Sequence, residues 1–177
     1  MESALLGIVV DSSVLIRAER RHHSIPELIE AIQACAGEVE LSISPVTVAE
    51  LVHGIYRAQT PEQCQRRERY IHAFLELLPV HPATARTGFI AGKIEGQEAA
   101  IGNVLPFNDV MIAAAAIEQG YGVLTENIRH FEKIPGLDVR PSRNVIVTRG
   151  PVSSLQIWPL SRQRYACHLD PARHKPG

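Results

Sequence analysis

Cysteine is scarce in this chain, and long apolar runs are absent. The 177 residues include three cysteines, Cys35, Cys64 and Cys167, which are odd in number and widely spaced. This argues against a disulfide framework or a zinc site and favours reduced thiols. No apolar run approaches the ~18–20 residues of a membrane span, and no basic residue precedes Arg17, as a secretory signal would require. We therefore expect a cytoplasmic protein without membrane contact.

The composition is that of a folded domain with an attached extension. Hydrophobic residues make up 45% of the chain and charged residues 21%, which is enough apolar surface for a sizeable core. The near-neutral net charge conceals an asymmetry. Residues 1–140 carry 12 Lys and Arg against 18 Asp and Glu, whereas residues 141–177 carry six against one. We predict an acidic domain over 1–140 and a basic C-terminal extension over 141–177.

Apolar runs alternate with segments of helical period, which predicts an α/β fold with a central parallel sheet covered by helices. The expected strands are 6–10, 40–44, 122–125 and 137–140, and the expected helices are 13–21, 26–36, 46–58, 61–77, 83–100 and 106–120.

The most informative junction lies at the end of the first strand. Leu6 to Val10 form an apolar run typical of a strand buried on both faces, and Asp11 follows at once. In open α/β sheets, ligands bind at the edge where the strands end. A carboxylate at this edge is poorly suited to core packing and well suited to holding a cation or accepting a phosphoryl group.

Three further polar residues occupy comparable junctions. Glu50 lies in the second turn of its helix, Asp109 in the first turn of an Ala-rich helix, and Asn127 just after the strand 122–125. A helix dipole stabilises a first-turn carboxylate by ~0.3–1 kcal/mol. Each residue alone also suits a plain structural role, as a helix acid or a turn residue. Their recurrence at the same kind of junction predicts one polar cluster.

These residues lie in four blocks: VVDSSVLI at 9–16, ISPVTVAEL at 43–51, NDVMIAAAA at 108–116 and VLTENIRHF at 123–131. Taken in this order, the blocks resemble the PIN-domain ribonucleases and, within them, the VapC-type toxins of toxin–antitoxin pairs. The resemblance covers about residues 6–140. It implies a three-layer α/β/α fold and a metal-dependent endoribonuclease that hydrolyses phosphodiester bonds in single-stranded RNA.

The resemblance also implies roles for individual residues. Asp11 and Asp109 would be the principal ligands of Mg²⁺ or Mn²⁺, Glu50 would complete the acidic cluster directly or through water, and Asn127 would be the fourth catalytic residue. The family often has Asp at that fourth position. The amide of Asn127 removes one negative charge, so binding of a second metal ion is expected to be weaker than binding of the first. The expected partners are RNA, a cognate antitoxin protein and a second copy of the chain. The helices 46–58 and 61–77 offer apolar surface for the protein contacts.

The residue types suit this chemistry on physical grounds. A divalent ion acidifies bound water and relieves negative charge on the attacked phosphoryl group. Mg²⁺ keeps several waters and takes one or two carboxylates, so this set of acids and an amide is an adequate ligand shell. Clustered carboxylates without a cation would repel one another.

Other residues have weaker signals. Arg17, Arg20 and Arg21 follow Asp11 and would contact RNA phosphates, or else form a solvated helix end. His53 shares a helix face with Glu50 and would support it from behind the ligands. His130 would orient a ligand or, more simply, lie at the surface. Four basic residues of the extension, Arg162, Arg164, Arg173 and Lys175, would bind RNA or form a loose terminus, and His168 and His174 have no metal-binding spacing.

Two alternatives remain open at this stage. One is a catalytically weak PIN-like module that binds RNA or a protein, which Asn127 and the acidic body favour. The other is a phosphoryl-transfer domain with Asp11 as covalent acceptor. Phosphatases of the haloacid dehalogenase type would have a second Asp where Ser13 stands, and response-regulator receivers would have an acidic pair and a late lysine that this chain lacks.

Overall fold

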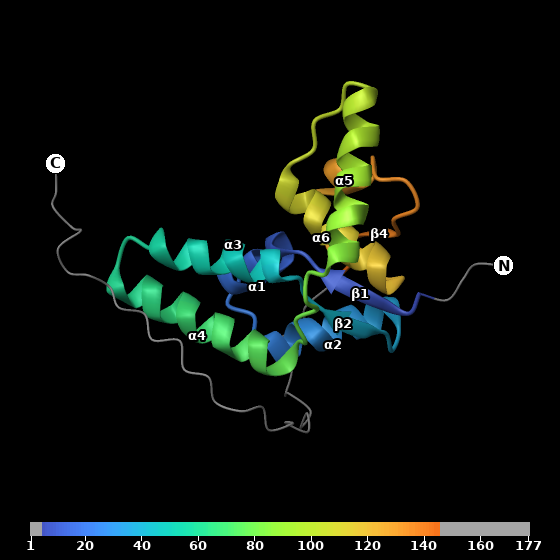
Figure 1. Cartoon of the computed structure of the whole chain (residues 1–177). Coiled ribbons are helices and arrows are strands. Elements are labelled where there is room, and N and C mark those ends of the chain that lie inside the picture. The colour runs from blue at the N-terminus through green and yellow to red at the C-terminus, as the bar shows by residue number, and fades with distance from the viewer. Residues whose placement is uncertain (1–4, 146–177) are drawn as a thin grey trace, which may run out of the picture.

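A four-stranded parallel sheet forms the centre of the protein in the computed structural model, which describes residues 5–145 (Figure 1). The strands are β1 (Gly7–Val10), β2 (Glu40–Ser42), β3 (Gly122–Thr125) and β4 (Val139–Pro141), in the spatial order β2-β1-β3-β4. All three pairings are parallel, so the strands end at the same edge of the sheet. Val9 of β1 pairs with Val123 of β3, although most of the chain separates them.

Seven α-helices surround the sheet in the described part of the chain. They are α1 (Ser12–Arg20), α2 (Ile25–Ala36), α3 (Pro45–Tyr56), α4 (Pro61–Leu77), α5 (Ala85–Ala100), α6 (Phe107–Gln119) and α7 (Ile128–Phe131), and a short 3₁₀ helix follows at Ser142–Asn144. Hydroxyl side chains cap four of them, because Ser24, Ser44, Thr60 and Thr84 each accept a hydrogen bond from a backbone N–H of the first turn.

The elements predicted from the sequence agree with this structure to within about two residues at most ends. The short helix α7 was not predicted, because four residues carry no recognisable period. The last strand, β4, runs one residue past the predicted domain boundary at 140, and Pro141 pairs with Thr125. Residues 146–177, which hold most of the predicted extension, lie outside the described residues.

The two faces of the sheet belong to two separate apolar cores. Ile8, Val10 and Leu124 point to the first core, which α1 to α4 cover. Val9 and Val123 point to the second, which α5, α6 and α7 cover. Alternate residues of the same buried strands therefore build both layers, as expected for a parallel sheet with helices on each side. The result confirms the predicted three-layer α/β/α fold.

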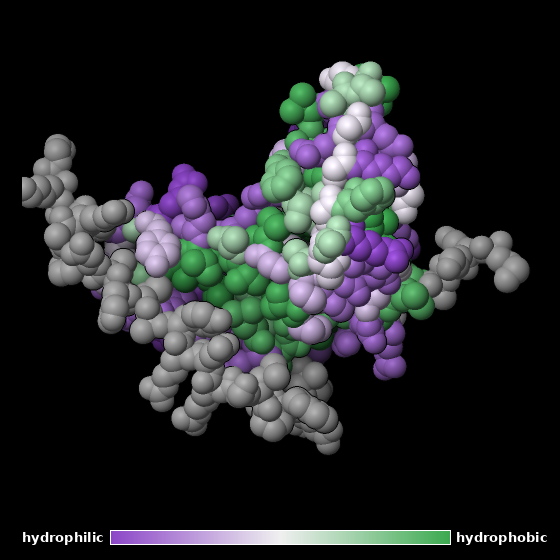
Figure 2. All heavy atoms as spheres, viewed as in Figure 1, coloured by the Kyte–Doolittle hydropathy of each residue, from purple (hydrophilic) through white to green (hydrophobic). Residues whose placement is uncertain are grey.

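The helices extend away from the sheet as two arms. The pair α3 and α4 forms one arm, and α5 stands upright on the other side of the sheet, packed against α6 (Figure 1). In the space-filling view, an apolar patch lies between α3 and the neighbouring end of α4 on the visible face (Figure 2). Among the described residues, no helix is long and apolar enough to cross a membrane.

Small side chains let α6 lie close to the sheet. Ala113, Ala114 and Ala116 are fully buried between β1, β3 and α5. A helix with larger residues here would stand further from the strands, because packed interiors leave little spare volume. The alanines thereby determine how near the first turn of α6 comes to the carboxyl ends of the strands.

We predict that Ala116→Leu destabilises the protein by ~1–3 kcal/mol, because the added atoms have no space in this layer. The free energy of unfolding in urea measures the effect. Ala99→Leu is the matched control, since Ala99 is exposed on α5, and it should change stability by less than about 0.5 kcal/mol. Equal effects of the two variants would contradict the role assigned to the alanines.

Candidate metal and phosphodiester site

Asp11 lies at the end of β1, where the strand passes into α1. Its backbone N–H donates to the carbonyl oxygen of Leu124 at 3.0 Å, which extends the pairing of β1 with β3 by one step. The side chain is 1% exposed. Its Oδ2 accepts hydrogen bonds from the hydroxyls of Ser13, at 2.6 Å, and Thr125, at 2.8 Å. The carboxylate is therefore buried and held from both α1 and β3.

Asp109 lies in the first turn of α6 and is also buried. Its Oδ2 lies 2.6 Å from Nδ1 of His130, a half-exposed residue of α7. Ala113 and its neighbours keep this end of α6 near the sheet. The contact with His130 fixes one carboxylate oxygen of Asp109 and orients the other.

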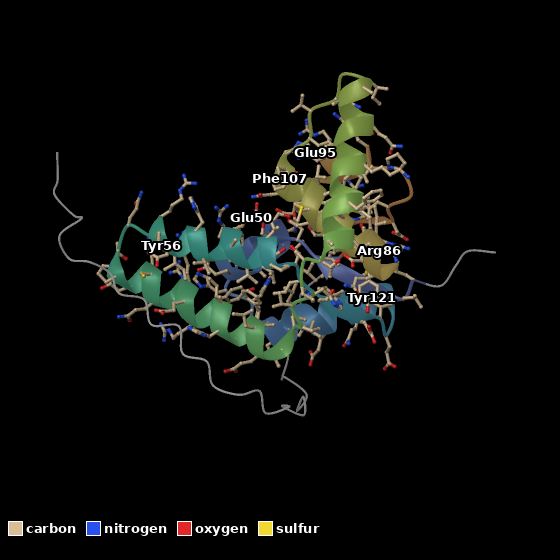
Figure 3. All side chains as sticks on the ribbon, viewed as in Figure 1. Glu50, Tyr56, Arg86, Glu95, Phe107 and Tyr121 are labelled. Carbon is tan, nitrogen blue, oxygen red and sulfur yellow. The ribbon has the colours of Figure 1, made fainter. Side chains whose placement is uncertain are left out.

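Glu50 approaches the same region from α3. Its Oε1 accepts a hydrogen bond from Nδ2 of Asn108 at 2.8 Å, which ties α3 to the start of α6. Figure 3 shows Glu50 on the side of α3 that faces Phe107, the first residue of α6. His53, predicted as a possible neighbour of Glu50, lines the adjoining groove.

Burial and nearby charges shift the pKa values of Asp11 and Asp109. Burial raises the pKa of Asp11, the Ser13 and Thr125 hydroxyls lower it in part, and the charges of Asp109 and Glu50 raise it further. Burial also raises the pKa of Asp109, with His130 lowering it and Glu50 raising it. The charges of Asp11, Glu50 and Asp109 therefore interact at this edge of the sheet, and a bound cation would offset their repulsion.

Asn127 also lies at this edge of the sheet, but it is connected to Asp11 only through Thr125. It is the residue before α7, and its backbone N–H donates to the Thr125 hydroxyl at 2.9 Å, one link away from Asp11. It lines an open hollow together with His130 and Arg143. The structure thus brings Asp11, Glu50 and Asp109 together and places Asn127 beside them.

The donor set fits a hard divalent cation. Between residues 5 and 145, no three His, Cys, Asp or Glu side chains are close enough to hold a metal ion by themselves. Mg²⁺ does not require such a cage, because it retains waters and takes only one or two carboxylates. Asp11 and Asp109 would supply these, and Glu50 would act through water.

Two contacting residues, Ser13 and Thr125, escaped the sequence-based prediction, and both donate to Asp11. A hydroxyl residue two positions after Asp11 and another at the end of the neighbouring strand were available signals for them. His130, which the sequence favoured as a surface histidine over a residue that orients a ligand, contacts Asp109.

The three arginines predicted to contact RNA have different surroundings. Arg17 forms an ion pair with Glu126 at 2.5 Å and donates to the Ser142 hydroxyl at 3.2 Å. Arg20 and Arg21 form no ion pair with a described residue, and with Ser13 and Ile16 they line a hollow of about 390 Å³. This hollow, the α1 hollow, lies next to Asp11 because Ser13 contacts both.

Comparison with known proteins identifies the family to which this fold belongs. A family model, the PIN domain, matches residues 8–137. Ribonuclease VapC1 of Rickettsia felis is 30% identical over 138 residues, which cover 76% of this chain and 95% of the relative. The tRNA(fMet)-specific endonuclease VapC of Salmonella typhimurium is 31% identical over 99 residues, covering 56% of this chain and 73% of that protein.

Solved structures show the same fold. The VapBC2 structure from Rickettsia felis, bound to a DNA fragment from its promoter, superposes with a TM-score of 0.66 at 22% identity, covering 76% of this chain and 97% of that one. The structure of DNA-bound VapBC from Salmonella typhimurium superposes with a TM-score of 0.66 at 24% identity. The match covers 77% of this chain and 98% of that one.

The fold, the buried carboxylates at its edge and these matches define a PIN domain. The chain belongs to the PIN-domain family, and within it to the VapC-type ribonucleases. This family membership confirms the prediction of an endoribonuclease of the toxin type.

We predict that Asp11→Asn stabilises the metal-free protein at neutral pH. Burial raises the folded-state pKa of Asp11, so its contribution to stability is full below the unfolded pKa of ~3.9 and is lost as pH rises through the folded pKa. Asparagine keeps an acceptor oxygen and carries no charge. The gain in the free energy of unfolding over wild type should therefore grow as pH increases from about 4. Urea unfolding in the presence of EDTA measures it. Ser13→Ala, which leaves the charge and removes a donor, should instead destabilise.

Proposed function

We propose that this protein is a Mg²⁺- or Mn²⁺-dependent endoribonuclease that hydrolyses phosphodiester bonds in single-stranded RNA, with Asp11, Glu50, Asp109 and Asn127 as its catalytic residues. One observation carries the proposal: the charges of Asp11 at the end of β1, Glu50 in α3 and Asp109 in α6 interact at the carboxyl edge of the sheet, and Asp11 and Asp109 are buried. Among the described residues, His130 is the only ion-pair partner of these carboxylates.

The residues of the site have separate tasks. Asp11 and Asp109 bind the cation, and when bound the cation supplies an acidified water and polarises the phosphoryl oxygens. The hydroxyls of Ser13 and Thr125 hold one oxygen of Asp11, and His130 holds one oxygen of Asp109. These contacts fix the ligands in position before the cation arrives. Asn108 holds Glu50 at the side of the site.

RNA would reach the site along the α1 hollow. Arg20 and Arg21 line it without an ion-pair partner among the described residues, and Ser13 places it next to Asp11. Arg17 serves less as a free cation, since Glu126 neutralises it. On an otherwise acidic domain, such local arginines are what attracts phosphate.

A cognate antitoxin is the proposed protein partner, as the VapBC structures of the relatives suggest. A groove of about 380 Å³ between α1, α3 and α4, lined by Ile16, Leu51 and Ile71, opens beside Glu50. We call it the α3–α4 groove. An antitoxin segment bound there would cover the acidic cluster. We also propose pairing as a homodimer through exposed apolar residues such as Tyr56, which is 66% exposed at the end of α3 (Figure 3), and a cytoplasmic location.

The decisive test is cleavage of total cellular RNA by the purified protein with Mg²⁺ or Mn²⁺. We expect discrete fragments, their loss in EDTA, and a fall in rate of roughly 100-fold or more in Asp109→Asn, because a ligand charge is removed. Glu95→Gln is the matched control, since Glu95 is exposed on α5, and it should cut at the wild-type rate. If folded protein with either metal cut no RNA, the non-catalytic binding module would become the better account.

A second prediction concerns the arginines of the α1 hollow. The double variant Arg20→Ala with Arg21→Ala should raise KM for RNA and flatten the dependence of log Kd on log salt, by ~0.7 for each lost phosphate contact on a single strand. Filter binding to the Asp109→Asn protein at several salt concentrations measures this slope. Arg86→Ala is the control, because Arg86 lies in the first turn of α5 and does not line this hollow. An unchanged slope would remove Arg20 and Arg21 from the RNA path.

A further inference from the structure

We propose that Arg17 and Glu126 are positioning residues for the proposed metal site, although neither is a ligand there. Together they hold the turn between β3 and α7, and this turn orients the hydroxyl groups that hold Asp11. The inference rests on the proposed function, because it takes Asp11 as a ligand of the cation.

Two consecutive backbone N–H groups of the turn control those hydroxyls. The N–H of Glu126 donates to Oγ of Ser13 at 3.1 Å, and the N–H of Asn127 donates to Oγ1 of Thr125 at 2.9 Å. A hydroxyl group has a single proton to donate. Because each oxygen accepts from the turn, its own proton points elsewhere, and both hydroxyls donate to Oδ2 of Asp11. The turn thus sets the direction of both bonds.

This arrangement determines how Asp11 faces a cation. Both hydroxyls donate to one carboxylate oxygen, so Oδ1 is the oxygen that they leave for a metal ion. Partners behind a ligand of this kind fix its orientation and tune metal affinity. The helix α7 begins directly after the turn and carries His130, which contacts Asp109. Moving the turn would therefore disturb both of the principal ligands.

Three side chains from separate segments hold the turn from its outer side. Arg17 of α1 forms the ion pair with Glu126 at 2.5 Å and donates to the Ser142 hydroxyl at 3.2 Å. That hydroxyl donates in turn to Oε1 of Glu126 at 3.2 Å. Each member contacts the other two, and we call these three residues the Arg17 cluster. It joins α1, the turn after β3 and the 3₁₀ helix after β4.

The surroundings of Arg17 favour positioning over RNA binding. Its side chain is 29% exposed and its guanidinium is engaged by two protein groups, whereas Arg20 is exposed and forms no ion pair with a described residue. An isolated surface ion pair restrains a structure weakly. A partly buried pair that closes a ring of hydrogen bonds restrains it more, because the bonds support one another.

The signs of two effects separate positioning from simple charge. Acting through space, loss of the positive charge of Arg17 would strengthen cation binding, and loss of the negative charge of Glu126 would weaken it. Positioning predicts that both losses weaken binding, because either one opens the Arg17 cluster. The response of Arg17 is therefore the diagnostic one.

The first test measures binding of Mn²⁺ to the full chain by electron paramagnetic resonance. We expect the dissociation constant to rise about 10-fold in both Arg17→Met and Glu126→Ala, the lower end of the range for residues that support metal ligands. The matched controls are Arg140→Met and Asp138→Ala, which open another partly exposed ion pair, next to and within β4. They should bind Mn²⁺ as wild type does. Unchanged or tighter binding by Arg17→Met would overturn the proposal.

Exchanging the two charges tests the ion pair as a unit. Arg17→Glu alone should weaken Mn²⁺ binding, although it adds negative charge near the site. Adding Glu126→Arg should bring the dissociation constant back toward the wild-type value, because the ion pair can form again with reversed polarity. If the double variant bound Mn²⁺ no better than Arg17→Glu, the pair would not position the site.

Cleavage kinetics distinguish positioning from contact with RNA. In Arg17→Met, kcat at low Mn²⁺ should fall, about 10-fold more Mn²⁺ should restore it, and KM for RNA should stay unchanged. A raised KM that excess Mn²⁺ does not correct would assign Arg17 to RNA binding and contradict the inference. If no protein cut RNA but the variants bound Mn²⁺ more weakly, positioning would stand and the proposed ribonuclease activity would fail.

A metal-free measurement tests the hold on the turn itself. In EDTA, the backbone amides of Glu126 and Asn127 should exchange their hydrogens at least about twofold faster in Arg17→Met than in wild type. Arg140→Met should leave both rates unchanged. Wild-type exchange at both amides in Arg17→Met would show that the turn is held without Arg17, which refutes the inference. This readout decides the matter even if wild type bound no Mn²⁺, a result that would remove only the proposed function.

Discussion

Removal of the Asp11 carboxylate from water is the constraint on which the site depends. A strand buried on both faces delivers the residue to the edge of the sheet, and α1 and β3 close over it. Two hydroxyls compensate part of the lost hydration, whereas Asp109 and Glu50 add repulsion. Burial and the neighbouring charges therefore make the ionised form of Asp11 costly in the native state. The cation proposed for this site would reduce that cost.

The surrounding contacts give the carboxylates a defined geometry. Small alanines of α6 bring Asp109 close to the strands, His130 holds one of its oxygens, and Asn108 connects Glu50 to the same helix. Each acidic residue is thus held by a neighbour from another element. A site built this way keeps its carboxylates oriented while they repel one another, which distinguishes it from a loose acidic surface patch.

Sequence alone predicted the elements and the acidic cluster, because both follow from local patterns. Asp11, Glu50 and Asp109 stand at junctions that the apolar periodicity marks. Contacts between segments that are distant in the chain could not be predicted from the sequence. The pairing of Arg17 with Glu126 joins positions 109 apart, and it removes one arginine from those free to bind RNA. The role of His130 depends on α7, a helix too short to leave a periodic signal.

The strand order carries a consequence for biosynthesis. β1 forms early in the chain but lies between β2 and β3, and Thr125, which holds Asp11, belongs to β3. Pairing between such distant segments slows folding, because the chain must close a long loop first. A nascent or truncated chain that stops before α6 and β3 lacks Asp109, Thr125 and His130 together. The complete site can therefore assemble only after β3 and α7 have left the ribosome.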